Sequence, residues 1–164
     1  MRLPNQSSSI MGITTDSICQ GEHMNDGLIT YKRDLDGVDW NEMKQTLQAD
    51  DFDNGRTPAQ LKRSFEQSYA TCITYADDRI IGTVRVLSDG VCNAYVVDVW
   101  TLTAYRNRGI ARTMMQQLLQ ELQGQHVYLF TDSAVDLYKK LGFREQPIGM
   151  GMVVGCWLNN KDEG

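Results

Sequence analysis

The stretch VVDVWTLTAYRNRGIA, residues 96–111, decides the fold of this 164-residue chain. Its first residues are apolar or β-branched except for Asp98, and they predict a buried strand over residues 91–101. A short basic turn with Gly109 follows. Apolar residues then recur at steps of three and four, which predicts an amphipathic helix over about residues 109–123.

The turn between this strand and this helix is suited to binding an anion. The first backbone N–H groups of a helix have no partner within the helix, and they lie at the positive end of its dipole. Gly109 allows a ligand close to the backbone, and Ala111 keeps the next outward position small. Arg106, Arg108 and Arg112 add positive charge. The turn alone also fits a tight connection with surface arginines, because short glycine motifs are weak evidence.

The segments around this unit predict a sheet. Three strand-like segments joined by two short polar turns indicate an antiparallel meander: residues 71–76, 79–87 and 91–101. A short apolar strand is expected over residues 126–130, after the long helix. Because a helix connects it to the preceding strand, the two should be parallel.

The rest of the chain adds helices and outer strands. Helices are expected over residues 40–49, from Pro58 behind a Thr57 cap, and from a cap at Asp132 or Ser133 to Gly142. Further strands are expected over residues 29–32, from Phe143, and over 153–158. These elements predict one α/β (α+β) domain over residues 28–164, with a mixed central sheet of six to seven strands and about four helices. Residues 1–27 are polar and are expected to form a loose tail.

Composition narrows the class of partner. The formal net charge of −5 argues against nucleic-acid binding and is compatible with a cationic substrate such as an amine. The chain has no run of 18 apolar residues, so no membrane span is expected. The four cysteines form no Cys-x-x-Cys pair, so no metal site is expected. Cys72, Cys92 and Cys156 lie in strand-like runs and are predicted to be buried free thiols in a cytoplasmic protein.

Two short motifs in this order resemble a known family. Residues 106–111 read Arg-x-x-Gly-x-Ala, and residues 138–143 read Tyr-Lys-Lys-Leu-Gly-Phe. Together they resemble the GNAT superfamily of acetyl-CoA-dependent N-acetyltransferases, whose motif A is Gln/Arg-x-x-Gly-x-Gly/Ala. The resemblance covers about residues 28–158 and is sharpest over residues 96–143. It is closest to plant and cyanobacterial aralkylamine-type members, which favours small arylalkyl or polyamine acceptors.

The resemblance implies where acetyl-CoA binds. In this family two adjacent parallel strands splay apart, here residues 91–101 and 126–130, and the pantetheine amides bond to the first strand as an added strand. The pyrophosphate lies on the N–H groups of the turn. The residues implied for the cofactor are Val99, Trp100, Thr101, Arg106, Asn107, Arg108, Gly109, Ile110, Ala111 and Arg112.

The resemblance also implies the chemistry. A neutral amine attacks the thioester directly in a ternary complex, and Tyr138 occupies the family's general-acid position. From its spacing alone Tyr138 is equally a core aromatic of its helix. Asp98 is the only carboxylate on the central strand and is a candidate general base. A strand bulge can instead turn Asp98 toward a structural partner, and water can then serve as the base.

The segment between the first two helices forms one wall of the acceptor site in the family. Here Asp51, Phe52 and Asp53 are candidates to receive a cationic amine with an apolar body, although a solvated polar turn is the alternative. We expect acetyl transfer to a small-molecule amine, with a protein or peptide acetyltransferase and a non-catalytic acyl-CoA sensor as alternatives. A homodimer through residues 153–158 is also compatible with the sequence.

Overall fold

The computed structural model describes residues 27–146, 149–153 and 158. The described part contains five strands, four α-helices and one short 3-10 helix, η1. In chain order these are β1 (Ile29–Lys32), α1 (Trp40–Ala49), α2 (Pro58–Glu66), β2 (Ala70–Ala76), β3 (Arg79–Ser88), β4 (Asn93–Thr101), η1 (Thr103–Tyr105), α3 (Ile110–Gln120), β5 (His126–Tyr128) and α4 (Val135–Lys140).

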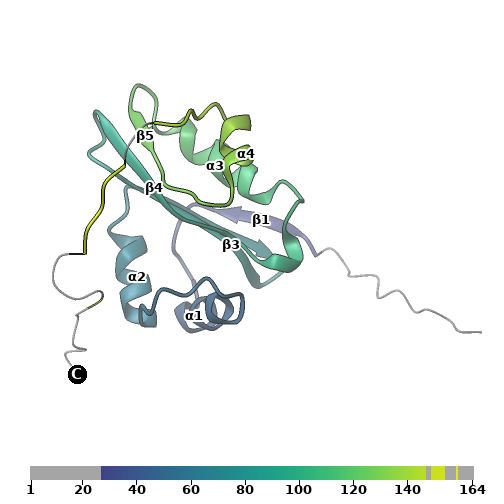
Figure 1. Cartoon of the computed structure of the whole chain (residues 1–164). Helices are drawn as coiled ribbons and strands as arrows, with labels where there is room; N and C mark the ends of the chain where they lie inside the picture. The colour runs from purple at the N-terminus through teal and green to yellow at the C-terminus, as the bar shows by residue number, and fades with distance from the viewer. Residues whose placement is uncertain (1–26, 147–148, 154–157, 159–164) are drawn as a thin grey trace, which may run out of the picture.

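The strands form one mixed sheet in the order β1-β2-β3-β4-β5. Neighbours from β1 to β4 are antiparallel, and β4 and β5 are parallel. Helices α1 and α2 cover one face of the sheet, and α3 and α4 cover the other (Figure 1). The predicted meander and the predicted parallel pair are both confirmed.

Local sequence signals account for the first two helices. The Asp39 carboxylate accepts hydrogen bonds from the backbone N–H of Asn41 (2.9 Å) and Glu42 (3.0 Å), which caps α1. Thr57 and Gln60 form a reciprocal capping box at the start of α2, with Pro58 in the first turn. Both helices therefore begin where the sequence predicts.

Helix α4 closes at Gly142 as predicted, but the residue that follows differs from the prediction. Gly142 has φ of 94° and donates to the Lys139 carbonyl (3.0 Å), while the Phe143 N–H donates to the Tyr138 carbonyl (3.0 Å). This is a Schellman closure, and it ties Phe143 to the helix. The Phe143 ring also meets the Tyr138 ring edge-on, with 5.9 Å between centroids. The prediction that Phe143 begins a strand is therefore wrong.

The described sheet has five strands rather than six to seven. Gly149 and Gly151 weaken strand formation beyond α4, because glycine offers no side chain to pack. The last strand predicted, residues 153–158, lies largely outside the described residues. Residues 1–26 of the predicted tail (1–27) and the thiol of Cys156 lie outside them as well.

The turn before β4 shifts the start of that strand. The Asp89 carboxylate accepts from the backbone N–H of Val91 (2.8 Å), Cys92 (2.8 Å) and Asn93 (3.1 Å), so β4 begins at Asn93 rather than at Val91. Cys92 is consequently exposed, and the prediction that it is buried is wrong, whereas Cys72 is a buried free thiol as predicted.

The core lies on both faces of the sheet, and α3 contributes its centre. Met114, Met115 and Leu118 are fully buried, and the Met114 side chain lies over Gly82 of β3. A Cβ built on Gly82 would lie 3.1 Å from the Met114 methyl group, so glycine provides the space for this methionine. Within the described ranges, no helix is long and apolar enough to cross a membrane.

The parallel pair separates early. Only Asn93–Tyr95 of β4 pair with His126–Tyr128 of β5. β4 then continues to Thr101 along β3, without β5 on its other side. The splayed pair expected from the sequence is therefore present, and it leaves one edge of β4 open over its second half.

We predict that Met114→Ala lowers the free energy of unfolding by about 2–5 kcal/mol, because it removes a fully buried side chain and leaves a cavity over Gly82. Urea denaturation measures this change. Gln116→Ala, at an exposed position of the same helix, serves as the control and should change the free energy by less than about 0.5 kcal/mol. Equal effects of the two substitutions would contradict the packing described.

Candidate functional site

A β-bulge lies in the centre of β4. Thr83 of β3 pairs with Trp100, while Arg85 pairs with Val97, so Asp98 and Val99 together face the single residue between them on β3. Asp98 has φ of 54°, a left-handed conformation that is uncommon for residues other than glycine and is tolerated best by aspartate and asparagine. The bulge therefore inserts one extra residue into β4 just after it leaves β5.

The bulge reverses the direction of the backbone groups that follow it. The Asn93 carbonyl accepts from the Asp89 N–H (3.3 Å), and the Leu102 N–H donates to the Ile81 carbonyl (2.8 Å). The backbone groups of Asn93 and Leu102 therefore both point toward β3. In a regular strand the direction of the backbone groups alternates from residue to residue, so two residues nine positions apart would point to opposite sides. After the bulge, Val99 and Thr101 therefore direct their backbone groups to the open edge of β4.

Asp98 is held by two arginines. Its Oδ2 accepts from Arg56 Nη2 (2.7 Å) and Arg85 Nε (2.6 Å), and its carbonyl accepts from the Thr83 hydroxyl (3.0 Å). The three charged side chains are all largely buried. Of the two roles that the sequence leaves open for Asp98, its contacts here are those of a structural partner.

A cavity of about 720 Å³ lies beside the open edge of β4. It lies between the second half of β4, the turn before α3 and the start of α4. Most of the residues predicted to bind the cofactor line this cavity, and so does Tyr138. Its lining includes Val99, Trp100, Thr101, Arg106, Asn107, Gly109, Ile110, Ala111, Arg112 and Tyr138. Arg108 is absent from this lining, and its guanidinium lies over the Tyr105 ring at 5.0 Å.

The turn opens the helix start to this cavity. Asn107 (φ 62°) and Gly109 (φ 81°) both adopt left-handed conformations, and α3 begins at Ile110. The Thr113 N–H makes the bond to the Gly109 carbonyl (3.0 Å) that starts the helical ladder. The preceding N–H groups, from Ile110 to Arg112, belong to residues that line the cavity. The positive end of the helix dipole thus faces this space.

Asp50, at the end of α1, fixes the far end of β4. Its carboxylate accepts from Trp100 Nε1 (2.8 Å), from the Thr103 N–H (3.1 Å) and from Arg106 Nη2 (3.3 Å). Arg106 Nε also donates to the Thr101 carbonyl (3.0 Å). Burial alone would raise the pKa of Asp50, but the hydrogen bonds from Thr103 and Trp100 and the charge of Arg106 outweigh it, so the pKa is lowered.

Sequence reasoning did not single out Asp50. It lies in a run of acidic residues with Asp51 and Asp53, and nothing in the linear sequence separates the three. In the structure Asp53 pairs with Lys44 (2.7 Å), and Asp51 is exposed and does not line the cavity. Phe52 does line it, and its ring lies 6.4 Å from the Trp100 ring. Of the three predicted acceptor residues, only Phe52 reaches the site.

A smaller cleft of about 210 Å³ adjoins the cavity through the gap between the strands. Residues 96–99 of β4 form one wall, and residues 129–134, which follow β5, form the other. Phe52, Val99 and Tyr138 line both spaces. Molecules entering from the two sides would therefore meet at these residues.

Tyr138 lies at this junction and is only 8% exposed. Burial raises its pKa, so the phenol stays protonated at neutral pH and can act as a proton donor. In the same cavity wall, the Thr101 hydroxyl is buried and has no hydrogen-bond partner. The described residues contain no group of three or more His, Cys, Asp or Glu side chains arranged to hold a metal ion.

Comparison with known proteins identifies the family to which this chain belongs. The model of the acetyltransferase (GNAT) family matches residues 34–143, about two thirds of the chain. This chain belongs to the acetyltransferase (GNAT) family. The expected family is therefore confirmed, and it is a family that uses acetyl-CoA as cosubstrate.

Two of the similar curated proteins come from plants. A protein named histone acetyltransferase TAP1 of Glycine max is 33% identical over 76 residues, covering 44% of this chain and 33% of its own length. A chloroplastic GCN5-related N-acetyltransferase 2 of Arabidopsis thaliana is 32% identical over 78 residues, covering 45% of this chain and 30% of its own length. The chain thus spans about a third of the length of these relatives.

Solved structures share the fold. A probable acetyltransferase from Staphylococcus aureus superposes with a TM-score of 0.68 at 21% identity, covering 79% of this chain and 100% of that chain. A GNAT family protein from Streptococcus pneumoniae gives a TM-score of 0.65 at 24% identity, covering 77% of this chain and 98% of that chain. At these identities the likeness concerns the fold alone.

We predict that Asp50→Asn lowers the free energy of unfolding by about 1–3 kcal/mol at pH 7, because a largely buried, charge-assisted hydrogen-bond acceptor is weakened. The folded-state pKa of Asp50 lies below its ordinary value of 3.8, so its stabilisation is fully present above pH 4 and is lost as the pH falls through the lower folded-state value. Urea unfolding at pH 7 and near pH 2.5 measures this. Asp51→Asn controls for the lost charge, and an Asp50→Asn effect no larger than the control's would contradict the role of Asp50.

Proposed function

We propose that this protein transfers the acetyl group of acetyl-CoA to the primary amine of a small molecule by direct attack in a ternary complex. The observation that carries the proposal is the junction at Val99 and Tyr138. There, an open strand edge beside a helix N-terminus meets a second, smaller cleft. The larger cavity offers an open strand edge and a helix N-terminus to an anionic donor. The smaller cleft has room for a small acceptor.

The residues of the larger cavity fit coenzyme A. Val99 and Thr101 offer backbone groups at the open edge to the pantetheine amides, as an added strand would. The N–H groups of Ile110 to Arg112, at the positive end of α3, suit the pyrophosphate. Acetyl-CoA supplies an activated thioester there.

Two groups of the chain then serve the reaction. The nitrogen lone pair of the neutral amine attacks the thioester carbonyl, whose oxygen accepts a hydrogen bond from the Val99 N–H as charge develops on it. The C–N bond forms and the C–S bond breaks. The leaving sulfur takes its proton from the Tyr138 hydroxyl, which its burial keeps protonated.

The amine must lose a proton, and we assign this step to water. Asp98 lines the small cleft, but its Oδ2 is already shared between Arg56 and Arg85. Because both arginines occupy this oxygen as a structural acceptor, Asp98 is poorly placed to take the amine proton. Solvent in the cleft can accept the proton without an essential side chain.

The size of the smaller cleft favours a small molecule over a protein chain as acceptor. Its volume of about 210 Å³ is below the roughly 300–1,000 Å³ of usual ligand pockets. One relative is named a histone acetyltransferase, so a peptide acceptor is the second candidate. Acetylation of peptides but of no small amine would favour that candidate.

We predict that the protein releases coenzyme A thiol from acetyl-CoA when a small primary amine is added. We also predict that Gly109→Ala raises the dissociation constant for acetyl-CoA about tenfold or more, because the substitution perturbs the turn at the helix start. Thiol release and calorimetry measure the two effects.

Gly124→Ala is a matched control for this substitution. Gly109 (φ 81°) and Gly124 (φ 82°) have the same left-handed backbone, and an added Cβ meets nothing within 4 Å at either. Both substitutions should cost about 1 kcal/mol of stability, and only Gly109→Ala should weaken acetyl-CoA binding. Equal dissociation constants for the two variants would contradict the assigned pyrophosphate site.

We predict that Tyr138→Phe lowers kcat about 100-fold and leaves the KM for acetyl-CoA within about twofold, because the substitution removes only the proton donor. Steady-state kinetics measure both constants. Tyr128→Phe, on the half-exposed Tyr128 outside the junction, serves as the control. A kcat unchanged in Tyr138→Phe would remove this tyrosine from the mechanism and leave it as a core aromatic.

A further inference from the structure

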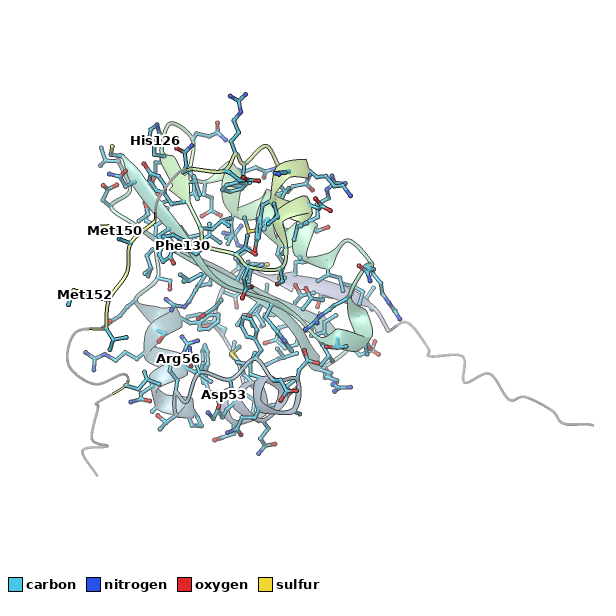
Figure 2. All side chains as sticks on the ribbon, viewed as in Figure 1. Asp53, Arg56, His126, Phe130, Met150 and Met152 are labelled. Carbon is cyan, nitrogen blue, oxygen red and sulfur yellow. The ribbon has the colours of Figure 1, made fainter. Side chains whose placement is uncertain are left out.

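The small cleft is lined, among the described residues, by two carboxylates and by no basic side chain. The carboxylates belong to Asp98 of β4 and to Asp132, which follows β5. Arg56 and Arg85 both donate to Asp98, and neither is among the described residues that line the cleft. Arg56 lies beside α2, apart from the segment after β5 that carries Phe130 (Figure 2). The charge of Asp98 is thus already balanced within the fold, and Asp132 is the remaining charge that a molecule in the cleft would meet.

Asp132 does not cap the helix that follows it. The sequence predicts a cap of α4 at Asp132 or Ser133. Instead, the Thr131 hydroxyl accepts a hydrogen bond from the Ala134 N–H (3.0 Å), so that prediction is wrong. The Asp132 carboxylate makes no hydrogen bond or ion pair with any residue that the structure describes, and the residue is exposed. It can therefore bind a cationic ligand without first breaking a contact of the fold.

Two exposed aromatic rings line the same cleft. Phe52 is 39% exposed and Phe130 is 70% exposed. Large apolar side chains that are exposed together at a cleft indicate a ligand that covers them. An aromatic face attracts a cation through its quadrupole, and it also removes methylene groups from water. Both properties suit a short aliphatic chain that carries a positive charge.

The position of Asp132 suits a second cation better than the reacting nitrogen. The nitrogen that attacks the thioester must be neutral, because an ammonium group has no lone pair. A carboxylate beside this nitrogen would stabilise its ammonium form. Asp132 lies on the wall of the cleft opposite Val99, beside which we place the thioester, so a molecule that spans the cleft meets both. A second positive charge in that molecule also favours the neutral form of its reacting nitrogen.

From this arrangement we infer that the acceptor is a diamine, whose second ammonium group binds Asp132 while its first, neutral amine attacks the thioester. The carboxylate oxygens of Asp132 accept hydrogen bonds from the ammonium group. Asp132 thus selects the acceptor and takes no part in the bond changes. The size of the cleft favours a short linker between the two nitrogens. This inference rests on the proposed function, and it names the substrate class and a specificity-determining residue of the same site.

The first experiment compares acceptors that share one aliphatic chain and differ only at its far end. Putrescine, 4-amino-1-butanol and 5-aminopentanoate carry a primary amine on the same butylene chain, which ends in an ammonium, a hydroxyl or a carboxylate group. Thiol release with acetyl-CoA measures kcat/KM for each, and the value for putrescine is halved because its two amines are identical. The three-carbon and five-carbon diamines are tested against their own amino alcohols in the same way.

We expect kcat/KM to be about tenfold or more higher for the diamine than for the amino alcohol at one chain length or more, and lowest for 5-aminopentanoate. Equal values within every pair would overturn the inference. So would a carboxylate as the best acceptor, or phenethylamine as a better acceptor than every diamine.

Substitution of Asp132 then tests the residue itself. Asp132→Asn should lower kcat/KM about tenfold for the preferred diamine, through KM, and less than about threefold for its amino alcohol. Asp132→Glu keeps the charge and should keep the preference for the diamine. Asp78→Asn, at an exposed position in the turn between β2 and β3 and outside the lining of both spaces, is the matched control. An equal loss for the diamine and the amino alcohol in Asp132→Asn would overturn the inference.

A binding measurement separates this inference from the proposed function. If no amine releases thiol while acetyl-CoA binds, acetyl transfer to small amines is contradicted. Calorimetry of the coenzyme A complex with putrescine and with 4-amino-1-butanol then still tests the cation site. Tighter binding of putrescine that is lost in Asp132→Asn supports the site. Equal binding of the two compounds, or a preference that Asp132→Asn leaves unchanged, contradicts it.

Discussion

The extra residue at Asp98 is the constraint on which the arrangement of the site depends. It forces a left-handed backbone into the centre of β4, and two arginines and one hydroxyl hold it there. Because of it, Val99 and Thr101 direct their backbone groups away from β3, into the space that β5 has left. Without the extra residue those groups would point into the sheet, and the open edge would have other residues.

The same bulge places Trp100 on the face of α1 and α2. Its indole N–H meets Asp50, and that carboxylate also holds Thr103 and Arg106 at the start of the turn. Two carboxylates thus fix the second half of β4, whose edge is open. Asp98 holds its beginning and Asp50 holds its end, both from the same face of the sheet. Both act as hydrogen-bond acceptors within the fold, which leaves Tyr138 as the proton donor that the proposed chemistry uses.

Much of the fold was predictable because its signals are local. Asp39 and Thr57 are caps whose side chains bond a few residues away, and both helices begin where expected. The meander and the parallel pair follow from turn lengths and one connecting helix. The strand expected from Phe143 failed because its N–H bonds back to Tyr138, although Gly142 marks that helix end in the sequence. Of the candidate site, the turn and Tyr138 were found in advance, and Asp51 and Asp53 were placed in an acceptor wall that only Phe52 reaches.

The sequence alone determined the strand–turn–helix unit and the family, and it singled out Tyr138 as a candidate, because each depends on residues close together in the chain. Only the tertiary structure decided the roles of the acidic residues. Asp50 meets Trp100 fifty residues away, and Asp98 meets Arg56 from another loop and Arg85 from the next strand. The partner of a carboxylate depends on which segments the sheet brings together. The aspartates look alike in the sequence, and nothing near them indicates which distant residue each one will contact.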